Sequence, residues 1–277
     1  MPMQAQLLRL IAESVGGLTV DRLFRSLRET FPALVRRDFR EMLQQLVTDG
    51  RLHYRQHHGV TRIALGGYRP AKISERIYLM AAPMSARIPP GSAGVRLAEG
   101  TAFGAGDHPT TCLMLRALDP AIIGRGAPGK RAQILDVGTG NGVLAIAALL
   151  LGAERVVGLD IDPQACHEAR HNARLNEVAE RFLVVAGSVE TMASGCYDLL
   201  LANLRPPTLA RLLPRFGALL APTGLLMLSG FRCAERTGVE KGLPSGFQVV
   251  QADQDRDWAM LVARRGAPLF GSILGGP

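Results

Sequence analysis

The chain has 277 residues, 47% of them hydrophobic, which is enough for one substantial core and a smaller second domain. Its formal net charge is +8, and residues 1–72 carry 12 basic against 6 acidic side chains, so the excess lies mostly near the N-terminus. The longest apolar run, residues 143–151, is too short to span a bilayer, and residues 1–10 lack the basic-then-apolar pattern of a secretory signal. A cytoplasmic protein is therefore predicted.

The first 66 residues show three helical patterns followed by two short strands. Apolar residues recur at helical spacing in three segments: residues 4–13, a segment that begins after a cap at Thr19 and ends near Pro32, and residues from about 35 to 48. Residues 51–55 and 60–65 then have the alternation of strands around a turn. Three helices followed by a hairpin are typical of a winged helix-turn-helix, so a small winged-helix domain is predicted for residues 1–66.

The third helix of this domain would be its recognition helix, and it carries Arg36, Arg37 and Arg40. With the charge excess of the segment, these residues would suit a nucleic acid or a ribosomal surface. The alternative is that the arginines only solvate an outer helix face. Three histidines near the hairpin turn lack a fourth ligand, and the four cysteines form no CxxC pair, so no metal site is predicted.

Residues 67–100 are expected to be a linker with lead-in strands at 76–81 and 94–97, and residues 266–277 a flexible tail. From 101 to 265 strand and helix patterns alternate. Strands are expected at about 134–137, 155–159, 182–186, 197–202, 225–228, 247–250 and 258–263. Such alternation predicts a doubly wound α/β domain whose mainly parallel seven-stranded sheet is covered by helices on both faces.

Residues 135–142, LDVGTGNG, lie where a strand turns into a helix and indicate a nucleoside site. Gly138, Gly140 and Gly142 would let a ligand lie against bare backbone, and Asp160, after the next strand, would accept both ribose hydroxyls. The GxGxG spacing differs from the GxGxxG that seats a pyrophosphate on a helix N-terminus. It favours S-adenosylmethionine, which has a ribose but no phosphate. Asp162, before a proline, is interpreted as a helix cap.

The loops after later strands supply two further candidates. Ser188 would accept a hydrogen bond from the amino group of adenine, although an ordinary turn explains it equally well. Asn203 and the stiff backbone at Pro206 would offer oxygen acceptors to the N–H bonds of an amine nucleophile. The alternative is that Asn203 caps the helix that begins at the prolines.

Residues 102–111, AFGAGDHPTT, precede another helix and suit a loop that folds over a ligand. Thr111 would reach the amino-acid end of the cofactor. Phe103, with Pro206, would desolvate the acceptor amine and favour its neutral form. His108 is either a base or, more commonly for this position, a helix cap.

These residues together resemble the PrmA-type methyltransferases, which N-methylate large-subunit ribosomal protein 11. The family signature FGTGxHPTT is close to residues 103–111, and the similarity extends over about 72–265. The resemblance implies a Rossmann-like class I methyltransferase fold, with cofactor contacts at Thr111, Gly138, Asp160 and Asn203. Two features depart from the family: residues 205–207, Arg-Pro-Pro, stand where it has small residues, and the winged helix stands in place of its N-terminal domain.

Three functions remain open. The first is an S-adenosylmethionine-dependent N-methyltransferase of a protein amine, either a lysine or an N-terminus, for example of a ribosomal protein. Asn203 would orient the nitrogen lone pair, and no strong general base is evident. The second is a DNA or RNA methyltransferase guided by the winged helix. The third is a regulator that senses the cofactor without catalysis.

Overall fold

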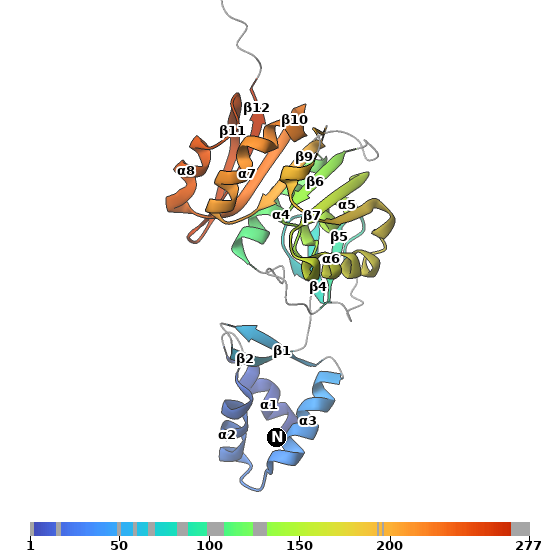
Figure 1. Cartoon of the computed structure of the whole chain (residues 1–277). Helices are drawn as coiled ribbons and strands as arrows, with labels where there is room; N and C mark the ends of the chain where they lie inside the picture. Colours follow the sequence, from blue (N-terminus) through green and yellow to red (C-terminus); the bar gives the residue numbers. More distant parts are fainter. Residues whose placement is uncertain are drawn as a thin grey trace, which may run out of the picture. The chain divides into compact units, whose positions relative to one another are not determined.

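The computed structural model describes residues 3–14, 18–48, 51–57, 60–65, 70–81, 88–98, 108–123, 132–192, 194–195 and 197–266. The chain divides into two compact units between Arg69 and Pro70 (Figure 1). This division lies three residues beyond the boundary expected at 66. In the described part of the chain, no helix has the length and apolarity needed to cross a membrane.

The N-terminal unit contains three helices followed by an antiparallel hairpin, in the order that the sequence predicted. Its elements are α1 (Met3–Ala12), α2 (Val20–Thr30), α3 (Arg36–Thr48), β1 (Leu52–His57) and β2 (Val60–Leu65). Thr19 caps α2 as expected, because its side chain accepts a hydrogen bond from the Arg22 backbone N–H at 3.3 Å. Apolar side chains from all five elements form one core. The assignment of this unit as a winged helix stays a prediction.

The arginines of α3 are partly neutralised within the unit itself. Arg36 pairs with Asp21 at 3.1 Å and lies 4.9 Å from the ring centre of Phe24, and Arg37 pairs with Glu41 at 3.0 Å. Exposed pairs of this kind add little stability. They do lower the positive potential of the helix, which favours the solvated-face interpretation of these arginines.

The C-terminal unit is built on a seven-stranded sheet in the order β11-β12-β10-β9-β6-β7-β8. Its strands are β6 (Gln133–Val137), β7 (Arg155–Asp160), β8 (Phe182–Ala186), β9 (Tyr197–Asn203), β10 (Leu220–Arg232), β11 (Phe247–Asp255) and β12 (Trp258–Arg265). All pairs are parallel except those of β12, which runs antiparallel to both of its neighbours. The predicted fold, a mainly parallel seven-stranded sheet, is confirmed.

Helices cover both faces of this sheet because successive residues of its strands point to opposite sides. Ile134 faces the core formed with α4 (Pro109–Ile123), α5 (Val143–Leu150) and α6 (Pro163–Leu175). Its neighbour Leu135 faces the core formed with α7 (Pro206–Leu219) and α8 (Arg236–Lys241) (Figure 1).

The lead-in strands form a separate three-stranded sheet, which the sequence did not predict. It contains β3 (Ala71–Lys72), β4 (Ile77–Ala81) and β5 (Ala93–Leu97), with β4 parallel to β5. Most of its buried side chains belong to the core that includes α4, α5 and α6. Within the large sheet, β6 lies between β7 and β9, so the strand order reverses there and the carboxyl ends of these strands flank a crevice.

Candidate functional site

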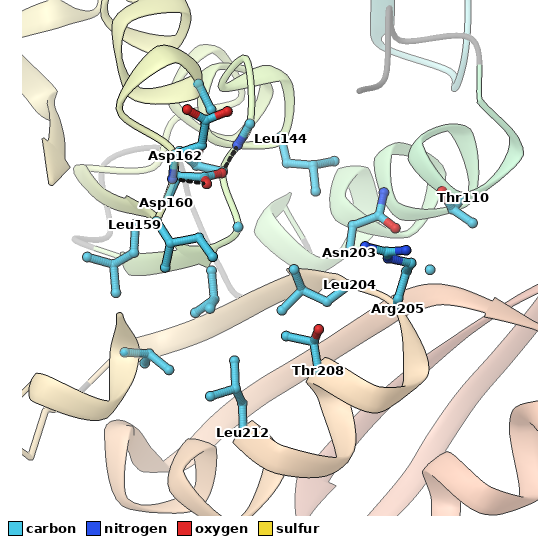
Figure 2. A pocket seen from close by; sticks show the side chains of 18 of the residues that line it. Thr110, Leu144, Leu159, Asp160, Asp162, Asn203, Leu204, Arg205, Thr208 and Leu212 are labelled. Carbon is cyan, nitrogen blue, oxygen red and sulfur yellow. Dashed lines mark hydrogen bonds between the residues drawn. The ribbon is translucent and has the colours of Figure 1, made fainter. Parts of the chain in front are cut away.

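A cavity of about 710 Å³ opens at this reversal point. It is lined by residues at the carboxyl ends of β6, β7 and β9, by the first turn of α4 and by the start of β12 (Figure 2). The polar side chains that meet there include most of those that the sequence singled out. A few convergent polar groups in a mainly apolar crevice are typical of a small-molecule site.

The glycine turn adopts backbone conformations that favour glycine. Gly138, Gly140 and Gly142 have φ values of +74°, +57° and +82°, in the left-handed region. Gly138 and Gly140 line the cavity, but Gly142 is not among the described residues that do so. A Cβ on Gly142 would lie 2.9 Å from a ring carbon of Phe182, so this glycine serves the packing of α5 against the sheet.

Asp160, the last residue of β7, connects the glycine turn to the following loop. One carboxylate oxygen accepts a hydrogen bond from the Gly140 backbone N–H at 2.9 Å, and the other accepts one from the Asp162 N–H at 3.0 Å (Figure 2). A carboxylate has about four acceptor positions, so each oxygen retains one for a ligand hydroxyl. Asp162 itself accepts from the Gln164 N–H at 2.8 Å, which confirms that it caps α6.

Beneath the turn lies a buried carboxyl group. Asp136 is 1% exposed and accepts a hydrogen bond from the Thr139 hydroxyl at 2.7 Å. Burial raises the pKa of Asp136 to about 7, against the lowering effect of the Thr139 hydrogen bond. Asp136 therefore supports the turn from the core side.

Asn203 ends β9 on the other side of the cavity. Its Nδ2 donates a hydrogen bond to the Thr111 hydroxyl at 3.5 Å, so two predicted site residues from distant segments meet. The cap of α7 is Arg205, which makes no side-chain capping bond, and Pro206 occupies the first helical position. The capping alternative for Asn203 is therefore wrong. Pro206 is not among the described lining residues, whereas Arg205 is.

The first turn of α4 presents His108 and two threonines to the cavity. His108 Nδ1 lies 2.7 Å from the Thr110 hydroxyl and accepts from the Thr110 N–H at 3.3 Å, as a helix cap does. Its ring meets Trp258 edge-on, with the ring centres 4.8 Å apart. Trp258 lines the cavity and was missed by the sequence analysis, although it is the only tryptophan of the chain. Phe103 lies outside the described residues.

Ser188 lines the cavity and also forms the turn that was its alternative interpretation. Its hydroxyl donates to a Glu190 carboxylate oxygen at 2.9 Å and accepts from the Glu190 N–H at 3.3 Å. A contact between Ser188 and adenine stays a prediction. No group of three metal-ligating side chains occurs among the residues that the structure describes.

Comparison with known proteins agrees with this geometry. The family described as "Ribosomal protein L11 methyltransferase (PrmA)" matches residues 59–266. The chain belongs to the PrmA family. A solved member, the ribosomal protein L11 methylase from Lactobacillus delbrueckii subsp. bulgaricus, superimposes with a TM-score of 0.65 at 28% identity, over 72% of this chain and 100% of that one.

Two PrmA relatives show how far the similarity extends. The ribosomal protein L11 methyltransferase of Pelotomaculum thermopropionicum is 38% identical over 199 residues, which are 71% of this chain and 62% of the relative. That of Marinobacter nauticus is 36% identical over 253 residues, 89% of this chain and 81% of the relative. The chain therefore spans less than two thirds of the first relative, while the second alignment reaches into residues 1–69.

Proposed function

We propose that this PrmA-family chain is an S-adenosylmethionine-dependent N-methyltransferase that acts on a protein amine. One observation carries the proposal: Asp160 and Asn203, at the ends of β7 and β9, face the same cavity across the glycine turn. The Asp160 carboxylate suits the hydroxyl groups of a nucleoside sugar, and the Asn203 amide oxygen suits the N–H bonds of an amine. The names of the relatives, ribosomal protein L11 methyltransferases, support the reaction and a protein as its substrate.

The residues around the glycine turn fit the nucleoside part of this cofactor. Asp160 is held by two backbone N–H groups and still has acceptor positions for both ribose hydroxyls. Gly138 lines the cavity with a φ of +74°, a backbone conformation that favours glycine, so bare backbone faces the ligand there. When bound, the cofactor supplies an activated methyl group on a sulfonium.

The acceptor half of the cavity suits a neutral amine. Its Asn203 amide is oriented by the hydrogen bond from Nδ2 to Thr111, which leaves Oδ1 to accept an N–H of the amine. Arg205 lines the same half, and in Figure 2 its guanidinium lies beside Asn203. A nearby positive charge disfavours an ammonium, whose ordinary pKa is about 10.4 for lysine. Arg205 therefore helps the acceptor to lose its proton before transfer.

The purified full chain, incubated with methyl-labelled cofactor, tests the proposal. Ribosomal protein L11, ribosomal RNA and duplex DNA serve as separate acceptors, and mass spectrometry locates the label. We expect label on an amine of the protein, and a loss of kcat of about 100-fold in Asn203→Ala, with binding of S-adenosylhomocysteine retained. Label confined to nucleic acid would refute the proposal.

A second candidate, contact with nucleic acid, rests on the hairpin of the N-terminal unit. Residues 51–69 contain four basic and no acidic side chains, whereas residues 1–50 contain seven basic and six acidic ones. Arg55 and Arg62 are directly opposite each other in the β1–β2 register. A phosphate backbone is the complementary partner for a segment with this excess of positive charge.

Binding of the full chain to duplex DNA and to RNA at several salt concentrations tests this second candidate. Neutralising both hairpin residues in Arg55→Gln/Arg62→Gln should weaken binding and reduce the salt slope by about two. The matched control, Arg36→Gln/Arg37→Gln, removes the same charge from α3, where both arginines are already paired. Equal effects of the two double variants would contradict the hairpin as the contact.

A further inference from the structure

Two buried asparagines lie one turn apart at the C-terminal end of α6, outside the residues that the motifs indicated: Asn172 is in the last turn and Asn176 is the C-cap. Asn172 is 2% exposed and Asn176 is 8% exposed. A buried amide group is retained only where its donors and acceptor find partners. Of the two side chains, that of Asn172 donates a hydrogen bond to the glycine turn and that of Asn176 does not.

Asn176 binds only structural partners. Its Oδ1 accepts a hydrogen bond from the Arg96 N–H at 2.8 Å, and its Nδ2 donates to the Arg96 carbonyl at 2.7 Å. It thereby pairs with the edge strand β5 as a neighbouring strand would. Its Nδ2 also donates to the Asn172 carbonyl within α6 at 2.7 Å.

Asn172 connects β5 to the glycine turn. Its Oδ1 accepts from the Ala98 N–H, just after β5, at 2.9 Å, while its Nδ2 donates to the Asn141 carbonyl at 2.9 Å. Asn141 lies in the glycine turn and lines the cavity, and its own Oδ1 accepts from the Val143 N–H at the start of α5. One amide therefore holds both segments.

The lead-in sheet, to which Asn172 binds, is also hydrogen-bonded to α4 on the other side of the cavity. Asp119 of α4, 3% exposed, accepts from the Ser74 hydroxyl at 2.6 Å and pairs with Arg76 at 2.9 Å. The same helix brings Thr111 into the cavity. The lead-in sheet thus connects the glycine turn, through Asn172, to α4, whose Thr111 contacts Asn203.

We propose that Asn172 is a positioning residue, which holds the glycine turn in place relative to the lead-in sheet and α4. The inference rests on the proposed function, namely that the cavity binds S-adenosylmethionine. Because coupling between two segments is reciprocal, binding at the turn should stabilise the end of β5, and loss of the Asn172 bond should weaken binding. Asn176 caps the same helix, is also buried and binds the same strand, but its side-chain hydrogen bonds do not reach the glycine turn.

Asn172→Asp, compared at a pH high enough to ionise the introduced buried carboxyl, separates the two bonds, because an ionised carboxylate still accepts from Ala98 but donates nothing to the Asn141 carbonyl. The same change in Asn176→Asp is the matched control. Calorimetry measures the Kd of S-adenosylhomocysteine for each full-length protein, and hydrogen exchange follows the backbone amides of residues 94–98. The pair Asn172→Ala and Asn176→Ala repeats the comparison without burying a charge.

For Asn172→Asp we expect a Kd about tenfold higher, equivalent to about 1.4 kcal/mol, and for Asn176→Asp a change below about twofold. The ligand should slow exchange at residues 94–98 in the wild type and in the Asn176 variants, but not in the Asn172 variants. Equal weakening by both asparagine changes, or intact protection in the Asn172 variants, would overturn the inference while the proposed function stood. A wild-type chain without affinity for the ligand would overturn both.

Discussion

Replacing the buried Asp136 with asparagine should stabilise the chain at alkaline pH much more than at acidic pH. The carboxyl group lies under the glycine turn, 1% exposed, and burial raises its pKa from 3.8 to about 7. Asparagine has nearly the same shape and retains an oxygen that accepts from the Thr139 hydroxyl, but it cannot ionise. The variant removes the cost of a buried negative charge, which depends on pH, and one of the acceptors that serve the Thr139 hydroxyl and the Ala145 N–H, a loss that does not depend on pH.

The sign follows from the two protonation equilibria of Asp136. In the unfolded chain the carboxyl ionises near its ordinary pKa, whereas in the folded chain it keeps its proton up to about pH 7. Between these values the folded state binds more protons, so stability falls as the pH rises, and the full cost is present above about pH 7. A pKa difference of about three corresponds to about 4 kcal/mol.

Urea denaturation of the wild type and Asp136→Asn, at about pH 8 and about pH 5, measures the difference. We expect a gain of about 4 kcal/mol at the higher pH and about 1–2 kcal/mol at the lower. Asp38→Asn, at an exposed position on α3, controls for the loss of one negative charge. A gain for Asp136→Asn that is the same at both pH values would refute this account of the buried carboxyl.

Three further changes test the cavity. Asp160→Asn should raise the Kd of S-adenosylhomocysteine by about tenfold or more in calorimetry, because hydrogen bonds to a charged acceptor are about twice as strong as neutral ones; unchanged affinity would contradict a role at the ribose. Gly230→Ala should lower stability by about 1–3 kcal/mol more than Gly246→Ala in thermal denaturation. Both glycines have positive φ, +93° and +80°, but only a Cβ at Gly230 would collide with the Leu204 carbonyl; equal losses would count against that collision. Arg205→Glu should shift the pH profile of kcat, which reports the bound acceptor, to higher pH, because a carboxylate beside that acceptor favours its ammonium form. Arg205→Met should give a smaller shift in the same direction, and a shift to lower pH would exclude the proposed role.

The sequence predicted the large sheet well because strands buried on both faces appear as continuous apolar runs. It predicted β10 too short, at 225–228 instead of Leu220–Arg232. It also did not combine the lead-in strands into a sheet, because β3 has only two residues, too few for any periodicity. The two bonds of Asn172 join residues 31 and 74 positions away, and no local pattern encodes such a pairing.

The site was predicted where the rule for parallel strands applies and was missed where it does not. Asp160 and Asn203 end parallel strands, whose carboxyl ends converge at one edge of the sheet. Trp258 instead begins β12, which runs antiparallel to β10, with Trp258 opposite Arg232 at the end of that strand. The amino end of β12 therefore lies at the edge of the sheet where the carboxyl ends of the parallel strands lie. A search limited to strand ends overlooks such a residue.

The prolines that follow Asn203 explain why its side chain is available to the cavity. A helix begins with backbone N–H groups that lack partners, and an asparagine before it is usually used to satisfy one of them. Here Pro206 and Pro207 occupy the first two positions of α7 and have no N–H to satisfy. The next N–H, of Thr208, donates to the Arg205 carbonyl at 3.0 Å. Because the start of α7 requires no side-chain cap, the Asn203 amide remains directed at Thr111 and the cavity. The Arg-Pro-Pro sequence that departs from the family pattern therefore preserves the position of Asn203.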